Sequence, residues 1–232
     1  MIDAARLRDA LVAAREATDE ACRISGRPPG SAEIVLAGKY VTADEASALV
    51  EAGARVVGEN RLQDLVAKQD VLGDAVTFDF IGHLQSRKVK DVLPRVRLIH
   101  SVDRDSLIDE IGRRATSRPR VLLQVNLARE ETKGGFVPDD LSGALERACD
   151  AGVVVGGLMA LPPFTSDPEM SRPWFERLRE LRDDLAGEWG AEHDLRDLSM
   201  GTSQDFLVAV EAGATMVRVG RGIVDSTRME QP

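Results

Sequence analysis

The sequence predicts an α/β fold in which eight strand–helix units close into a single (β/α)8 TIM barrel. Short runs rich in β-branched residues alternate with longer amphipathic stretches along the 232 residues, a pattern typical of parallel strands joined by right-handed crossovers. The first strand-to-helix turn lacks the glycine-rich fingerprint of an open, doubly wound sheet, which is the rival architecture. Barrels of this length commonly form one domain, so we expect residues 1–232 to form a single domain.

The predicted elements follow one another in regular order. An amphipathic helix over residues 3–24 ends at the turn Gly26-Arg27-Pro28-Pro29-Gly30, so that residues 1–29 precede the barrel. The predicted strands are 34–38, 54–58, 77–82, 97–101, 120–126, 153–160, 197–200 and 215–220. The predicted helices between them are 43–52, 60–71, 84–92, 104–116, 138–150, 168–188 and 203–212. We expect residues 225–232 to form a frayed polar tail.

Capping signals support several of these helix boundaries. Thr42 and Glu45 have the spacing of a capping box, and Thr202 and Asp205 have it in a weaker form. An Ala-Gly step follows three of the predicted helices, at residues 52–53, 151–152 and 212–213, and fits a left-handed C-terminal cap.

Composition excludes several classes of function. The net charge of −9, with basic residues interleaved among acids, argues against a nucleic-acid-binding surface. No apolar run approaches the roughly 18 residues of a membrane span, and the first residues lack a signal-peptide core. Cys22 and Cys149 fall in helical patterns, which indicates reduced packing residues, and no cluster has metal-ligand spacing. We therefore expect a cytoplasmic globular protein.

Lys39 follows the first predicted strand directly and precedes a helix start. A lysine at this end of a barrel strand can lose its proton and attack a carbonyl, forming a Schiff base. The alternative is a solvated lysine at a helix entry. Among the other lysines, Lys133 in the loop after the fifth strand is the one competitor, whereas we expect solvated positions for Lys68, Lys88 and Lys90.

The loops after the seventh and eighth strands both contain glycine and small polar residues. They read Met200-Gly201-Thr202-Ser203 and Gly220-Arg221-Gly222. Phosphate sites in such barrels often form from these two loops, where backbone N–H groups at helix starts favour anions. Ser203 or Thr202 can add a hydroxyl donor. The alternative is turn geometry without a ligand.

Arg218 lies in an otherwise apolar strand and needs a partner there. It either forms an internal ion pair, with Glu59 or Asp79, or serves as a fixed donor to a ligand. For His83 and His100 we expect structural hydrogen bonds, with proton transfer as the alternative.

Many motifs in collinear order between about residues 30 and 224 match one known family. They include Leu36-Ala37-Gly38-Lys39, Gly58-Glu59-Asn60-Arg61, Phe80-Ile81-Gly82-His83-Leu84-Gln85, Leu198-Ser199-Met200-Gly201 and Met216-Val217-Arg218-Val219-Gly220. The chain resembles the pyridoxal phosphate homeostasis proteins, which are related to the N-terminal barrel of alanine racemase.

The resemblance implies a single barrel of the alanine racemase N-terminal domain type that holds pyridoxal 5′-phosphate (PLP). Lys39 matches the lysine that forms the Schiff base, and Arg218 matches the arginine that faces the pyridine nitrogen. The matches to the phosphate-binding positions are Ser203, Gly220 and Arg221, the latter two through backbone N–H groups. The matches to the pocket lining are Asn60 and Met200, with Ser199 and His83 as further candidates.

An arginine opposite the ring nitrogen keeps that nitrogen unprotonated and weakens the ring as an electron sink. The resemblance therefore implies a carrier in PLP homeostasis without robust turnover, with apo forms of PLP-dependent enzymes as recipients. We expect a monomer, because a barrel with no evident extra interface suits one. Three alternatives remain: an amino-acid racemase, a cofactor-free Schiff-base aldolase and a plain scaffold. A racemase needs a second acid/base opposite the lysine, and we expect the one tyrosine, Tyr40, to point away into the helix entry.

Two positions depart from the family pattern. Arg221 stands where a small hydroxyl residue is common; it either adds a phosphate contact or points to solvent. Gly38 stands where serine is frequent, and we expect this change to loosen the surroundings of Lys39.

Overall fold

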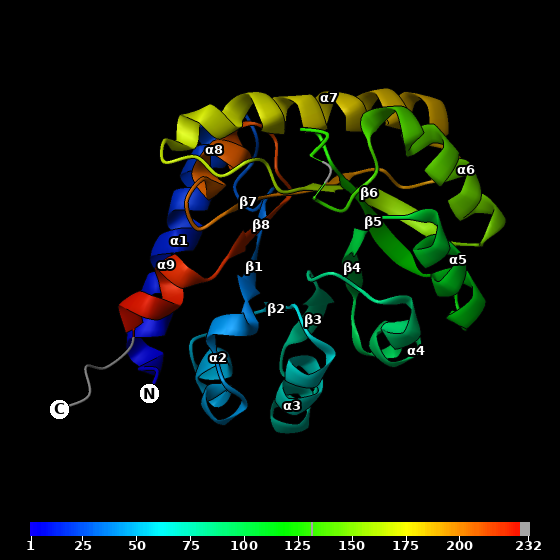
Figure 1. The fold of residues 1–232 in the computed structure, drawn as a ribbon. Coiled ribbons are helices and arrows are strands. Elements are labelled where there is room, and N and C mark those ends of the chain that lie inside the picture. Colours follow the sequence, from blue (N-terminus) through cyan, green and yellow to red (C-terminus); the bar gives the residue numbers. More distant parts are fainter. Residues whose placement is uncertain (131, 228–232) are drawn as a thin grey trace.

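Eight parallel strands close into a barrel in the computed structural model, which describes residues 1–130 and 132–227 (Figure 1). Neighbours in the sequence are neighbours in the barrel, and β1 pairs with β8 to close it. The predicted (β/α)8 architecture is therefore confirmed. The strands are β1 (Glu33–Ala37), β2 (Val56–Glu59), β3 (Thr77–Phe80), β4 (Leu98–Val102), β5 (Arg120–Val125), β6 (Val154–Ala160), β7 (Asp197–Thr202) and β8 (Met216–Val219).

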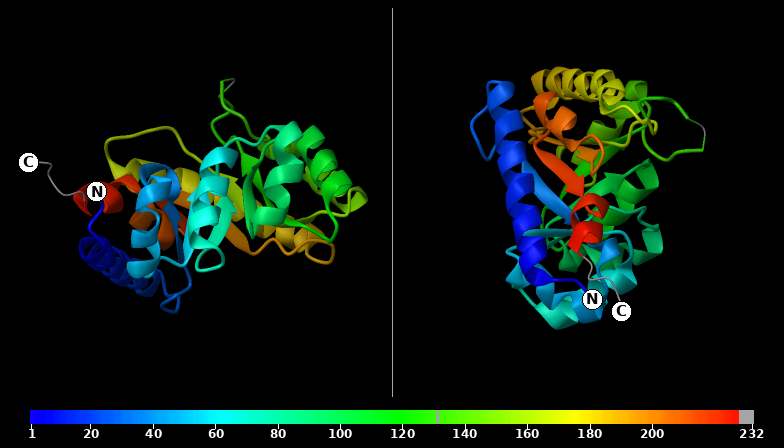
Figure 2. Two further views of the ribbon diagram at one scale, coloured as in Figure 1. Left: turned by 90° about the horizontal axis from the view of Figure 1, so that it is seen from below. Right: turned by 90° about the vertical axis from the view of Figure 1, so that its left-hand side faces the viewer.

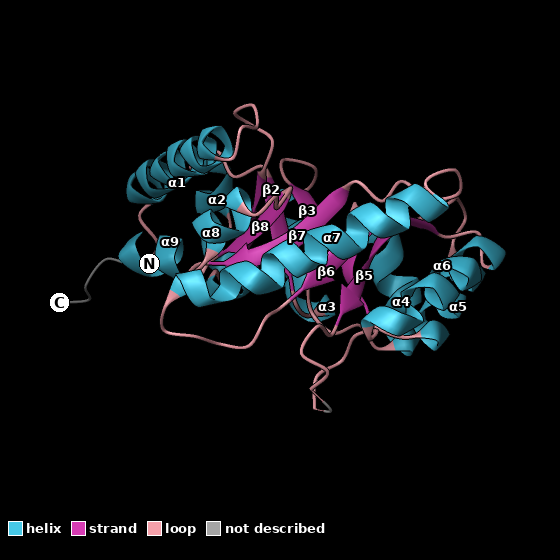
Figure 3. Cartoon of the chain, turned by 90° about the horizontal axis from the view of Figure 1, so that it is seen from above, coloured by secondary structure: helices cyan, strands magenta, loops and turns pink. Residues whose placement is uncertain are grey.

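Helices surround the strands, and the long helix α7 crosses over the strands in the view of Figure 3. The helices are α1 (Ala4–Ile24), α2 (Ser47–Glu51), α3 (Leu62–Leu72), α4 (Val89–Val92), α5 (Asp105–Arg114), α6 (Leu141–Asp150), α7 (Arg172–Trp189), α8 (Phe206–Glu211) and α9 (Arg221–Val224). Several predicted helices open as a 3₁₀ turn before the α-helix begins, at Ala43–Glu45, Ser86–Lys88, Pro138–Asp140 and Pro168–Ser171. Such turns are common at helix starts. Within the described ranges, no helix is both long and apolar enough to span a membrane.

The predicted start of the helix at 203–212 is wrong, because β7 continues to Thr202 and α8 begins only at Phe206. The backbone N–H and the hydroxyl of Thr202 both donate to Asp205 Oδ1, at 2.8 and 3.2 Å, which holds the intervening residues in a turn. Gly201 has a φ of +90°, and a Cβ there would lie 2.5 Å from the Cβ of Ala209 on α8. Ser203 therefore lies in a tight turn that leads from the barrel mouth to α8.

Helix α1 runs along one side of the barrel (Figure 2) and packs against α2, α8 and the turn Asp225–Thr227. The Asp3 carboxylate caps its first turn by accepting from the N–H groups of Ala5 and Arg6. The backbone N–H of Asp3 donates to the carbonyl of Thr227 at 3.1 Å, and Thr227 is buried. The expectation of a frayed tail is therefore wrong for residues 225–227, and the rest of that tail lies outside the described residues.

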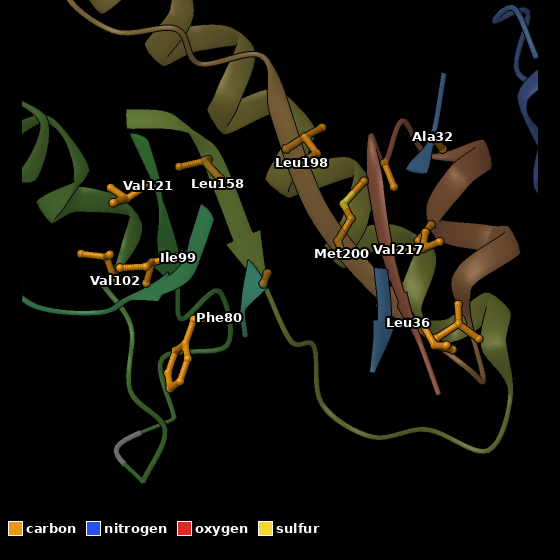
Figure 4. Close-up of a cluster of buried hydrophobic side chains, with 14 of the residues drawn as sticks. Ala32, Leu36, Phe80, Ile99, Val102, Val121, Leu158, Leu198, Met200 and Val217 are labelled. Carbon is orange, nitrogen blue, oxygen red and sulfur yellow. The ribbon is translucent and has the colours of Figure 1, made fainter. Parts of the chain in front are cut away.

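Alternation along the strands divides the core into two parts. Side chains inside the barrel form one apolar cluster, made of Val35, Val56, Leu98, Leu122, Met159 and Met216. The residues between them face the helices and form a larger cluster, part of which is drawn in Figure 4. The same period of two continues from Val35 to Ala37 and from Met216 to Arg218, and both Ala37 and Arg218 line the mouth of the barrel. Lys39 follows in the 3₁₀ turn Gly38–Tyr40, where the strand period no longer applies, and its exposed side chain lines the same mouth.

Glu59, at the end of β2, and Lys68 on α3 form a buried ion pair. The Nζ of Lys68 on α3 lies 2.6 Å from Glu59 Oε1, and both side chains are buried, so the expected solvated position of Lys68 is wrong. A Cβ at Gly38 would lie 2.1 Å from the same oxygen. The departure at position 38 thus makes room for the Glu59 carboxylate instead of loosening the site.

We predict that Lys68→Met lowers the free energy of unfolding by about 3–5 kcal/mol at pH 7, because it leaves the Glu59 carboxylate buried and unpaired. The exposed Lys90 on α4 provides the control, and Lys90→Met should change stability by no more than about 0.5 kcal/mol. Urea unfolding of both variants measures the difference.

The loss of unfolding free energy in Lys68→Met should depend on pH in a defined direction. Burial raises the pKa of Glu59 above its ordinary value of 4.5, although the hydrogen bond and charge of Lys68 lower it. The native state therefore keeps a proton that the unfolded state releases, and stability falls as pH rises above 4.5. The deficit of Lys68→Met should shrink as pH falls from neutrality towards this value; a constant deficit would contradict the assignment.

Candidate functional site

A cavity of about 480 Å³ opens at the carboxyl ends of the strands. It brings together six residues that the sequence predicted for the site: Lys39, Asn60, Ser203, Arg218, Gly220 and Arg221. Its volume lies in the range typical of small-molecule sites. Residues far apart in the sequence therefore meet at the mouth of the barrel because each follows or ends a strand.

Positive charge dominates this cavity. Its lining includes Lys39, Arg218 and Arg221, and no acidic side chain lines it among residues 1–130 and 132–227. Cations that lie close together without intervening acids favour an anionic ligand.

Ser203 and Gly220 bring polar groups together at the two loops after β7 and β8. The N–H of Gly220 donates to Ser203 Oγ at 3.0 Å, and the N–H of Gly222 donates to the same oxygen at 3.4 Å. A hydroxyl and backbone N–H groups thus converge beside Arg221. Because the two N–H groups donate to Ser203 Oγ, the hydroxyl keeps its own hydrogen to donate, and a hydroxyl beside a guanidinium is a donor set that phosphate oxygens accept from.

Arg218 is buried and is held by neutral acceptors. Its Nη1 donates to the carbonyl oxygen of Ser199 at 2.7 Å and to the Ser199 hydroxyl, and its Nη2 donates to the carbonyl oxygen of Ala160 at 2.9 Å. The ion pair that we considered with Glu59 or Asp79 is wrong, because the structure pairs these carboxylates with other residues. Burial lowers the pKa of Arg218 to about 10, while the charge of Asp205 raises it, so the guanidinium stays protonated at neutral pH.

Asn60 contributes a polar atom that the protein leaves unsatisfied. Its Oδ1 is buried and has no hydrogen-bond partner in the part of the chain that the structure describes. Buried polar atoms are nearly always paired, so an orphaned acceptor in a cavity indicates a place for a ligand donor.

Tyr40 lines the cavity, so the expectation that it points away is wrong. Lys39 and Tyr40 share the 3₁₀ turn Gly38–Tyr40, and the Lys39 Nζ lies 5.0 Å from the centre of the tyrosine ring. The exposed Arg221 guanidinium lies 5.8 Å from the centre of the same ring. The ring of Tyr40 thus contacts two of the three cations of the cavity.

Three other candidates lie outside the lining of the cavity. Met200 faces the helices with Leu198 and Val217 (Figure 4), because the strand alternation that turns Ser199 inward turns Met200 outward. Its predicted place in the pocket lining is therefore wrong. His83 is exposed, with Nδ1 3.1 Å from Asp103 Oδ2. Lys133 is exposed and pairs with Glu130 at 2.7 Å.

Ser199 does not line the cavity either, but it contacts Arg218, which does.

Sequence reasoning missed the apolar part of the lining, which comprises Ala37, Ile81, Leu161 and Phe164. The period of two from Asp79 could have placed Ile81 inside the barrel. Phe164 is 83% exposed on the loop after β6, and the sequence carries no periodic signal for it.

Comparison with known proteins agrees with this geometry. The family model described as "Alanine racemase, N-terminal domain" matches residues 36–226. A curated pyridoxal phosphate homeostasis protein from Aquifex aeolicus is 43% identical over 210 residues, covering 88% of this chain and 91% of that protein.

Two solved structures are similar along nearly their whole length. An unknown protein from Bifidobacterium adolescentis has a TM-score of 0.87 at 32% identity, covering 96% of this chain and 97% of that one. PipY of Synechococcus elongatus PCC7942, solved with PLP bound, has a TM-score of 0.81 at 30% identity, covering 94% of this chain and 99% of that one. On its sequence, its barrel and the residues at its mouth, the chain belongs to the pyridoxal phosphate homeostasis protein family, whose barrel is that of the alanine racemase N-terminal domain.

Proposed function

We propose that this protein binds PLP at the barrel mouth and serves in PLP homeostasis, holding the cofactor as a Schiff base on Lys39. The proposal rests on the cavity, which places the Lys39 amine in the same lining as the phosphate-binding candidates Ser203 and Gly220. The described lining includes three cations and no acid. PLP is a phosphate dianion with an aldehyde, so it matches both features. The relative from Aquifex aeolicus is named for this role, and PipY was solved with PLP.

Each residue has a separate role in this proposal. Lys39 would hold PLP through a C=N bond between its Nζ and the aldehyde carbon, a condensation that releases one water. Ser203 Oγ donates its hydrogen to a phosphate oxygen, the N–H of Gly220 orients this hydroxyl by donating to Oγ, and Arg221 adds charge. The ring hydroxyl of PLP would supply the donor that Asn60 Oδ1 lacks.

Arg218 favours retention of the cofactor over turnover. Bound PLP supplies an electron sink for amino-acid chemistry, and it does so best when its ring nitrogen is protonated. Arg218 is a buried cation at the cavity and donates hydrogen bonds, so it stabilises an unprotonated nitrogen. This property of Arg218 supports a carrier rather than a general PLP enzyme.

We also propose that apo enzymes receive its PLP and that the protein acts in the cytoplasm as a monomer.

Tyr40 gives the racemase alternative one specific observation, because it lines the cavity. Two-base racemisation needs acid/base groups on opposite faces of the substrate. Tyr40 belongs to the same turn as Lys39 and packs beside its amine, which does not place it across the cavity. Racemase activity that Tyr40→Phe abolishes would make this alternative the better one.

We predict that Lys39→Ala abolishes covalent PLP attachment and leaves the fold intact, because the Lys39 side chain is exposed. Lys133→Ala removes another exposed lysine, which lies outside the cavity lining, and should not change the attachment. Borohydride reduction with PLP, followed by peptide mapping, should place the label on the Lys39 peptide in the wild type and in Lys133→Ala. Undiminished labelling of Lys39→Ala would reject Lys39 as the attachment site.

We also predict that Ser203→Ala raises the Kd for PLP by about tenfold or more, since a hydrogen bond to a charged group is worth about 1.5–3 kcal/mol. Ser117→Ala is the control, because Ser117 is exposed and outside the cavity lining. An absorbance titration measures both. Equal affinities for the two variants would remove Ser203 from the phosphate site.

A further inference from the structure

A continuous chain of hydrogen bonds runs through the barrel interior to Arg218. Arg97, just before β4, donates to both carboxylate oxygens of Asp79 at 3.0 and 2.7 Å. Asp79 Oδ2 lies 3.1 Å from His100 Nε2, and His100 Nδ1 lies 2.8 Å from Ser199 Oγ. Ser199 Oγ in turn contacts Arg218 Nη1. The side chains of Asp79, His100 and Ser199 are all buried, so these three members of the hydrogen-bond chain lie away from solvent, whereas Arg97 at its start is partly exposed.

The hydrogens of this chain can take only one order that satisfies every member. Arginine has no acceptor, so Arg218 donates to Ser199 Oγ. The Ser199 hydroxyl then has its hydrogen for His100 Nδ1, which must accept it. His100 must therefore carry its own hydrogen on Nε2 and donate it to Asp79, which also accepts from Arg97.

A second proton on His100 would break this order. Nδ1 would then donate to Ser199 Oγ, and the serine hydrogen would lose its acceptor in a buried site. The charged groups around the imidazole are Asp79 from β3, Arg97 beside β4 and Arg218 from β8. Burial lowers the pKa of His100, although its hydrogen bond to Asp79 and the charge of Asp79 raise it. An uncharged imidazole thus agrees with both the hydrogen-bond order and the burial.

We propose that Asp79, His100 and Ser199 are positioning residues, which orient the Arg218 guanidinium towards the cavity through one ordered hydrogen-bond chain. Ser199 thereby acts on the ligand through Arg218 instead of contacting it. The chain fixes Nη1 of Arg218 from one side, while the Ala160 carbonyl fixes Nη2. The effect on bound PLP rests on the function proposed above, whereas the state of the chain itself does not.

The first experiment uses the protein without PLP. In ¹⁵N-labelled wild type, NMR should show His100 uncharged with its hydrogen on Nε2 at neutral pH, and still uncharged as the pH falls through the ordinary histidine value of about 6.5, because burial lowers its pKa. His100→Gln assigns the signals among the three histidines. Arg218 should show separate, slowly exchanging guanidinium N–H signals. Ser199→Ala should average these and shift the His100 Nδ1 signal, and Ser199→Thr, which keeps the hydroxyl, should restore both.

The second experiment measures PLP binding by the same variants. Ser199→Ala should raise the Kd for PLP by about tenfold and shift the visible spectrum of the bound cofactor, because Arg218 loses one of its fixed acceptors. Ser199→Thr should stay within about twofold of the wild type, and circular dichroism confirms that each variant is folded.

The outcomes separate positioning from packing. A Ser199→Ala variant that melts at a lower temperature but keeps the wild-type Kd, spectrum and Arg218 signals overturns the proposal, as does a charged His100 in the wild type. Wild-type protein that binds no PLP defeats the proposed function instead, and the NMR of the unliganded protein then decides the positioning role by itself.

Discussion

The site depends on a buried arginine, Arg218, whose hydrogen-bond acceptors are neutral oxygens and not a carboxylate. Arg218 lies on the inner face of β8, where two carbonyl oxygens and one hydroxyl accept its hydrogen bonds. These dipoles satisfy its donors but do not neutralise its charge. With Lys39 and Arg221 beside it and no acid in the described lining, the mouth of the barrel is left with positive charge that an anionic ligand can neutralise.

Two acidic side chains of the barrel strands, Asp79 and Glu59, bind other residues and do not pair with the Arg218 guanidinium. The carboxylate of Asp79, which also faces the interior, is held by Arg97 and His100. Glu59 faces outward, where Lys68 on α3 neutralises it. Both acids therefore have partners away from the mouth. The strand period of two achieves this, because it assigns each residue to the interior or to the helix side.

Periodicity and residue order allowed the sequence to predict the barrel, and they placed Lys39, Ser203 and Arg218 in one cavity. The errors came from contacts that depend on tertiary packing. Met200 was assigned to the pocket although its neighbour Ser199 takes the inward position of β7. Lys68 was expected in solvent because a helical pattern does not reveal the Glu59 carboxylate behind it. Tyr40 was expected to turn away because side-chain direction in a 3₁₀ turn is not encoded by a period.

The most direct test of a cavity that demands an anion is calorimetric titration of the wild-type protein with PLP and with pyridoxal, which has the aldehyde but no phosphate. We expect one PLP per chain, bound at least about 100-fold more tightly than pyridoxal, since two or more hydrogen bonds to a charged group are lost without the phosphate. Equal affinity for the two compounds, or no binding of PLP, would contradict this expectation.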